Sequence, residues 1–224
     1  MTRRAAFLFD LDGTLVDSVY QHVLAWHEAL EREGIALSIW RVHRRIGMSG
    51  GLLVNMLARE TGQELDPARI ERVGRWHAEA YLRRAGDVRP LPGARELLAA
   101  LTAARIPWAI ATSSRLETAR PTLDVLGVSI DRDPIITRDE VVHAKPDPDL
   151  FLAAAARVGV DIAHSTVVGD SVWDMLAAQH ARCLGIGLLS GGYGEEELER
   201  SGAYRVFADP ASMLRHLDEL GARA

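Results

Sequence analysis

Short apolar segments recur along this chain, and a pattern typical of a helix follows each of them. Three are strong: AAFLFD stops at Asp10, PWAIATSS at Thr112 and STVVGDS at Asp170. Weaker segments are DPIIT, CLGIGLL and AYRVF, and the helical stretches cover residues 94–104, 116–127, 148–159, 171–181 and 210–220. Strands that alternate with helices are joined by right-handed crossovers and form a parallel sheet covered on both faces. We therefore predict an α/β fold.

One segment interrupts this alternation. Residues 17–87 contain helical patterns and no strand candidate, with Val23, Trp26 and Leu30 on one apolar stripe. We expect an all-helical domain of residues 17–87 inserted into a core of residues 1–16 and 88–224. Its two crossings would lie beside Asp10, where such a domain can act as a lid.

Asp10 and Asp12 stand one residue apart at the end of the first apolar segment. An EF-hand loop that starts at Asp10 would need Gly and Glu where the chain has Leu15 and Gln21, so that interpretation fails. Buried carboxylates with no basic neighbour are costly unless they bind a cation. A hard divalent cation, most simply Mg²⁺, fits this pattern.

Further polar residues follow the other strong segments. Asp170 ends one of them, and Asp174 lies one helical turn later, so both can face the same edge of the sheet. A metal held there would bridge carboxylates to an anion, and phosphate fits best. Lys145 and the hydroxyls of Thr112 and Ser113 would bind its oxygens. Lys145 is also the only lysine among the 26 lysine and arginine side chains, which favours a functional role for it. We expect Lys145 to lie in a solvated crevice.

Four stretches in this order, DLDGTLVDS, ATSS, KPDPD and GDSVWD, resemble the four motifs of the haloacid-dehalogenase superfamily of phosphohydrolases. The resemblance covers essentially the whole chain and implies a Rossmann-like core with an α-helical cap. It implies that Asp10 is the nucleophile and Asp12 the general acid and base. It also implies that Asp10, Asp12 (through its backbone carbonyl), Asp170 and Asp174 serve the Mg²⁺ site, and that Thr112 and Lys145 bind phosphate.

The motifs also narrow the reaction. Dehalogenases of this fold do not carry the second Asp of the first motif, and phosphonoacetaldehyde hydrolases need a cap lysine, which is absent here. The rival is a β-phosphoglucomutase-like enzyme. Those mutases carry an Arg directly after the Gly-x-Ser of the cap, where this chain reads Gly47-Met48-Ser49-Gly50, and a cap Lys where this chain has His77. We expect a phosphatase acting on small phosphate monoesters, of the phosphoglycolate-phosphatase type. A phosphate-binding regulatory module without turnover is a further alternative.

Two residues of the helical segment are candidate substrate contacts. His22 lies on its first predicted helix near Asp10, where it can touch substrate or Asp12, although a satisfied surface histidine fits the sequence equally well. Arg45 can meet a substrate anion, or it is one of several solvated charges in RVHRR.

Composition limits the partners and the location. A formal net charge of −5 argues against nucleic acid, and no apolar run reaches the roughly 20 residues of a membrane helix. The single cysteine, Cys183, suits a reducing compartment, so we expect a cytoplasmic protein whose partner is a small phosphorylated metabolite. The sequence names neither the substrate nor the oligomeric state.

Overall fold

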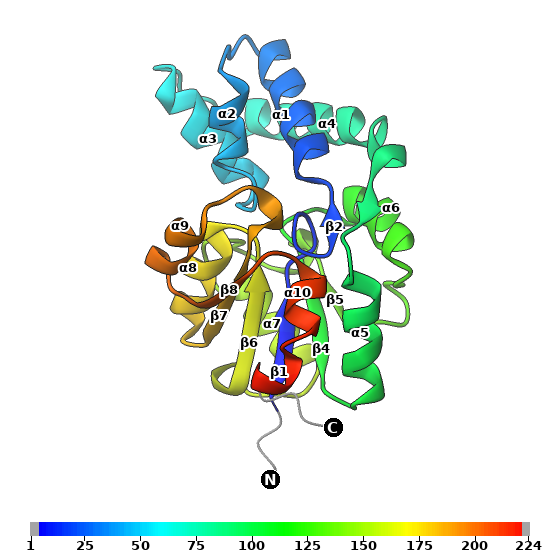
Figure 1. The fold of residues 1–224 in the computed structure, drawn as a ribbon. Coiled ribbons are helices and arrows are strands. Elements are labelled where there is room, and N and C mark those ends of the chain that lie inside the picture. The colour runs from blue at the N-terminus through cyan, green and yellow to red at the C-terminus, as the bar shows by residue number, and fades with distance from the viewer. Residues whose placement is uncertain (1–4, 221–224) are drawn as a thin grey trace.

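The structure, a computed structural model, describes residues 5–220. A six-stranded parallel sheet has the order β5-β4-β1-β6-β7-β8 (Figure 1). Its strands are β1 (Ala6–Phe9), β4 (Trp108–Ala111), β5 (Ile135–Ile136), β6 (Ser165–Gly169), β7 (Leu184–Leu188) and β8 (Ala203–Phe207). All six predicted strands are present, so the predicted α/β fold class is confirmed.

Helices cover both faces of this sheet. Phe7 and Phe9 point to a core shared with α5 and α6, whereas Leu8 points to a core shared with α7 and α8. This alternation is the two-residue period of a strand buried on both faces. The helices of this layer are α5 (Ala94–Ala103), α6 (Leu116–Leu126), α7 (Asp149–Arg157), α8 (Val172–Ala181), α9 (Glu195–Arg200) and α10 (Pro210–Leu214).

Two of the helices around the sheet differ from the prediction. The predicted helix over 210–220 ends at Leu214 and continues only as a 3₁₀ turn, Leu217–Leu220. Helix α9 was not predicted, because its six residues are mostly exposed glutamates with one buried side chain, Leu198. A helix that short carries too little apolar periodicity to be recognised.

Four helices stand at one end of the sheet, and we call them the cap (Figure 1). They are α1 (Val19–Arg32), α2 (Ile39–His43), α3 (Gly50–Glu60) and α4 (Pro67–Leu82). Their own apolar cluster includes Val23, Trp26 and Leu30, the stripe predicted on the first helix. Where the chain enters and leaves the cap, β2 (Val16–Asp17) and β3 (Arg89–Pro90) pair as an antiparallel ladder.

Backbone groups connect the cap to the sheet layer at several points. Ser49 N donates to the carbonyl of Lys145 at 3.2 Å, and the Tyr193 hydroxyl donates to the carbonyl of Arg44 at 2.9 Å. His43 Nε2 lies 2.9 Å from the carbonyl oxygen of Gly191. None of the described helices is long and apolar enough to cross a membrane.

Candidate active site

The sheet brings three predicted site residues to one edge. β1 lies between β4 and β6, so Asp10, Thr112 and Asp170 follow adjacent strands. The backbone N–H of Asp10 donates to the carbonyl of Val168 at 2.8 Å, which continues the ladder to the edge. The strand order reverses at β1, and ligands of open α/β sheets bind outside such a reversal.

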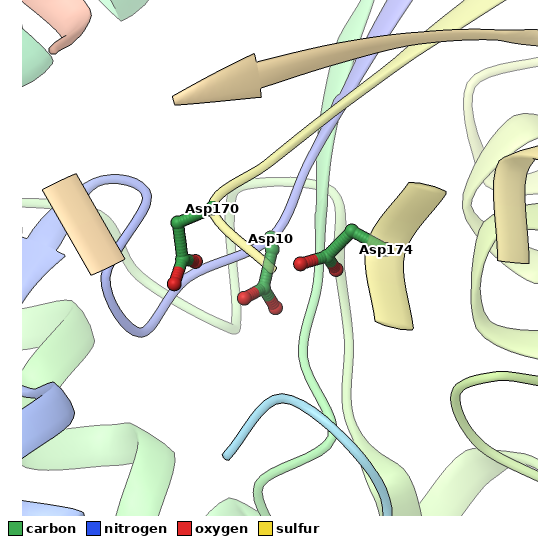
Figure 2. Close-up of side chains that lie close together, drawn as sticks. All are labelled: Asp10, Asp170 and Asp174. Carbon is green, nitrogen blue, oxygen red and sulfur yellow. The ribbon is translucent and has the colours of Figure 1, made fainter. Parts of the chain in front are cut away.

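Asp10, Asp170 and Asp174 form an acidic cluster at this edge (Figure 2). Each offers one carboxylate oxygen, and these oxygens all lie within 4.8 Å of one another. All three side chains are buried. Thr14 Oγ1 donates to Asp170 Oδ1 at 2.8 Å, and Ser171 Oγ donates to Asp174 Oδ2 at 2.6 Å. The carboxylates are therefore held in place from outside the cluster.

The electrostatics of the cluster favour a bound cation. Burial raises the pKa of Asp10 to about 7; Lys145 opposes this shift, whereas Asp174 and Asp12 add to it. Burial, Asp174 and Asp10 raise the pKa of Asp170 well above its ordinary range. Crowded carboxylates resist ionisation unless positive charge compensates them. Carboxylate oxygens suit a hard divalent cation, so the residues present fit a Mg²⁺ site.

Glycine is required where the chain passes closest to this cluster. Gly13 has φ +87°, and a Cβ built on it would lie 2.5 Å from Asp170 Oδ2. Any other residue at this position is therefore strained twice, by its backbone conformation and by its Cβ. The Gly of the first motif thus lets the turn after β1 pack against the carboxylate that follows β6.

Lys145 lies behind the cluster and is completely buried. Its Nζ forms an ion pair with Asp10 and a second with Asp174 Oδ1 at 2.8 Å, and it lies 5.0 Å from the centre of the Phe151 ring. Burial lowers the pKa of Lys145, but the two carboxylates more than offset this and raise it above its ordinary value. The expectation of a solvated crevice is wrong, because the loop carrying Lys145 packs under the cap.

Asp12 is not part of the acidic cluster and has its own set of partners. Its carboxylate accepts hydrogen bonds from Ser18 Oγ at 2.6 Å and from Ser114 Oγ at 2.9 Å, and His22 Nε2 lies 3.2 Å from Oδ1. Burial raises the pKa of Asp12, but His22 and these hydroxyls outweigh burial and lower it to about 2. The two aspartates of the first motif therefore have opposite electrostatic environments.

His22 is buried, so it is not a surface histidine. Its Nδ1 lies 3.0 Å from His77 Nε2, and its ring stacks on Tyr81 with the ring centres 3.9 Å apart. The ring of His77 in turn stacks on Trp26 at 3.8 Å. His77 and Tyr81 were not predicted as site residues, although their spacing of four places both on one face of α4.

The remaining candidates lie as follows. Thr112 is buried, with Oγ1 3.5 Å from Asp12 Oδ2, and Ser113 Oγ donates to the carbonyl of Gly47 at 3.0 Å. Arg45 does not line the cavity described next, because its Nη2 pairs with Glu60 Oε1 at 2.7 Å within the cap. Ser114, which sequence reasoning passed over in favour of its neighbours, donates directly to Asp12.

A cavity of about 320 Å³ separates the cap from the sheet edge. Asp10, Asp12, Thr112 and Ser113 line its sheet side, and His22 lies on its cap side. The structure thus brings the predicted catalytic carboxylates, two predicted phosphate ligands and one predicted cap contact, His22, to a single space large enough for a small molecule.

Comparison with known proteins identifies the class to which this fold and site belong. A family profile described as a haloacid dehalogenase-like hydrolase matches residues 5–182. The chain therefore belongs to the haloacid dehalogenase-like hydrolases, which confirms the family recognised from its four motifs.

Three individual proteins show how similar this chain is to known phosphatases and to solved structures. A phosphoglycolate phosphatase of Caulobacter vibrioides is 33% identical over 201 residues, which cover 89% of this chain and 84% of that protein. The crystal structure of a hydrolase from Pseudomonas syringae matches with a TM-score of 0.94 and 52% identity, and covers 96% of this chain and 98% of that chain. A putative β-phosphoglucomutase from Bacteroides vulgatus matches with a TM-score of 0.87 over 98% of this chain and 89% of that chain. At 22% identity, this last structure shares the fold alone.

Proposed function

We propose that this protein is a Mg²⁺-dependent phosphatase that hydrolyses small phosphate monoesters through an aspartyl-phosphate on Asp10. The observation that carries the proposal is the position of the Asp10 carboxylate. It belongs to the acidic cluster, pairs with Lys145 and lines the cavity. A relative that covers most of the chain is named a phosphoglycolate phosphatase, which supports the same reaction.

In the proposed first step, a carboxylate oxygen of Asp10 forms a bond to phosphorus as the bond from phosphorus to the ester oxygen breaks. Asp12 gives its proton to the departing alkoxide. With a pKa of about 2, Asp12 is ionised at neutral pH and must first receive that proton, which solvent water supplies. His22 Nε2 lies 3.2 Å from Asp12 Oδ1.

In the second step, the ionised Asp12 takes a proton from water while the water oxygen bonds to phosphorus. The bond from phosphorus to Asp10 breaks, so inorganic phosphate leaves and the carboxylate is restored. Lys145 holds the Asp10 carboxylate in place throughout, since its ammonium is enclosed between Asp10 and Asp174. Thr112 and Ser113 would offer hydroxyl groups to the phosphate oxygens.

Mg²⁺ would be held by Asp10, Asp170 and Asp174, with the backbone carbonyl of Asp12 as a further ligand, and it would neutralise negative charge on the phosphate. Residues 17–87 would act as the lid that excludes water from the cavity during the first step.

Mutase activity is the alternative. A mutase must hold a phosphorylated sugar in two orientations, which calls for cations facing the second phosphate. Among the described cap residues that line the cavity there is no lysine or arginine. The absence of these cations from the described residues on the cap side of the cavity therefore supports a phosphatase over a mutase.

Phosphate release from phenyl phosphate, with and without EDTA, tests the proposal. We expect Mg²⁺-dependent release by the wild type and its loss in Asp10→Asn, because an amide cannot form the acyl-phosphate. Asp131→Asn, in an exposed loop, is the matched control and should keep wild-type activity. Full activity in excess EDTA, or an active Asp10→Asn variant with deamidation excluded, would contradict the proposal. A sugar 1-phosphate that yields a sugar 6-phosphate and no free phosphate would favour the mutase.

A further inference from the structure

The cap side of the cavity is predominantly apolar. Trp26, Ile46, Met48, Leu53 and Ile70 all line it, and they come from α1, α3, α4 and the turn before α3. Since Asp10 lies on the opposite side, these side chains face the group that a phosphate monoester would release. An apolar wall stabilises an apolar part of that group by removing it from water.

Helix α4 leaves open space in this wall. Ile70, Gly74 and Ala78 follow one another at intervals of four residues, so they lie on one face, and all three line the cavity. A Cβ built on Gly74 would meet nothing within 4 Å. Glycine inside a helix costs about 0.5–1 kcal/mol relative to alanine, so helix stability does not explain it. The space beside Gly74 is consistent with room for a ligand.

The charges around the cavity do not match a second anionic group. Among the described residues that line it, the arginines are Arg115 and Arg138. Arg115 Nη2 lies 3.0 Å from Glu71 Oε2, and Arg138 donates to two backbone carbonyls at 2.6 and 3.2 Å. Glu71 and Glu117 add negative charge to the same wall. A carboxylate on the leaving group would have to displace Glu71 from Arg115 and lie close to Glu117.

We propose that the substrates of this site are phosphate monoesters of uncharged alcohols with an apolar face, and that an anionic leaving group is disfavoured. This inference rests on the phosphatase function proposed above. It separates the chain from its relative named phosphoglycolate phosphatase, because phosphoglycolate carries a carboxylate on the group released.

Two esters of the same shape and different charge provide the test. 3-Carbamoylphenyl phosphate is neutral in its leaving group, whereas 3-carboxyphenyl phosphate is anionic. We expect kcat/KM to be at least tenfold higher for the carbamoyl ester at saturating Mg²⁺. Equal values, or a preference for the carboxylate, would overturn the inference and leave the phosphatase intact. If neither ester nor phenyl phosphate releases phosphate, the phosphatase proposal fails and the inference fails with it.

A variant of Glu71 tests whether charge causes the preference. Glu71→Gln removes a carboxylate from the wall and releases Arg115 from its ion pair. We expect the ratio between the two esters to fall at least threefold, through a gain on the carboxylate. An unchanged ratio would show that the wall charges do not select the leaving group.

A variant of Gly74 tests where the leaving group lies. Gly74→Leu fills the open space, and we expect kcat/KM for the carbamoyl ester to fall at least tenfold while methyl phosphate changes less than threefold. Ala68→Leu, exposed in the first turn of the same helix, is the matched control. Circular dichroism and thermal melting verify that both variants fold. A folded Gly74→Leu variant with wild-type kinetics on the aryl ester would overturn the assignment of this wall.

Discussion

In the absence of divalent cations, the free energy of unfolding of this protein should fall as the pH rises from 5 to 8. The cause is Asp10, whose pKa is raised from 3.8 to about 7, first by burial and then by Asp174 and Asp12. The unfolded chain releases this proton near pH 3.8, whereas the folded chain retains it to about pH 7. The stabilising contribution is therefore complete below pH 3.8 and is lost as the pH rises through 7.

The size of the effect follows from the shift. A rise from 3.8 to about 7 corresponds to about 4 kcal/mol of unfolding free energy, at about 1.4 kcal/mol for each pKa unit. Roughly 2.5 kcal/mol of this should be lost between pH 5 and pH 8. The proposed Mg²⁺ site would use the ionised carboxylates of the folded state, so addition of Mg²⁺ at pH 8 should restore stability by ligand linkage.

Urea unfolding at pH 5 and pH 8, in EDTA and in Mg²⁺, measures both effects. His77 contributes with the opposite sign, because burial and His22 lower its pKa well below 6.5 and its contribution is lost as the pH falls. The comparison is therefore wild type against Asp10→Asn, since both retain His77. In EDTA the wild type should lose about 2.5 kcal/mol relative to the variant between the two pH values. A difference that does not change with pH would refute the assignment of a raised pKa to Asp10.

Three further substitutions separate the roles of individual residues. Lys145→Arg should lower kcat/KM about 100-fold, because a larger planar cation between two buried carboxylates displaces Asp10, the proposed nucleophile, by about 1 Å; an arginine variant within threefold of wild type would show that only positive charge is needed. Arg45→Ala should keep kcat/KM within about threefold and cost at most about 1 kcal/mol of stability, as its partner is Glu60; a tenfold loss of kcat/KM would show that Arg45 reaches the substrate. Gly13→Ala should lower the unfolding free energy by more than about 1 kcal/mol, since its φ of +87° excludes a Cβ; unchanged urea unfolding would contradict this.

The central strands of the sheet were predictable from sequence because they are buried on both faces. Residues 6–9 and 165–169 form short apolar runs that end at a polar residue. Where a helix follows such a run, the pattern indicates a buried strand of a parallel sheet. The ladder of β2 and β3 was not predictable in the same way. Each strand has two residues, and their pairing depends on the distance between the two crossings into the cap.

The environment of each site residue was harder to predict than its place in the fold. The motif placed Lys145 near Asp10, but its complete burial depends on the loop packing beneath Ser49 of the cap. In the sequence, His77 was noted only because it stands where β-phosphoglucomutase-like enzymes carry a cap lysine. In the structure it contacts His22, the residue beside Asp12, through a pairing of α1 with α4 that no local pattern specifies.

Asp10 and Asp12 show why two carboxylates one residue apart can serve different steps. Asp10 is buried and faces two other carboxylates, so its pKa rises, and the proposed cation would hold it in the ionised form that the proposed attack on phosphorus needs. Asp12 faces hydroxyls and His22 across the turn at Gly13, so its pKa falls. Groups whose environments move their pKa values apart are candidates for separate catalytic roles. A single turn after β1 thus separates the proposed nucleophile from the proposed acid and base, and the cap completes the second environment by supplying His22.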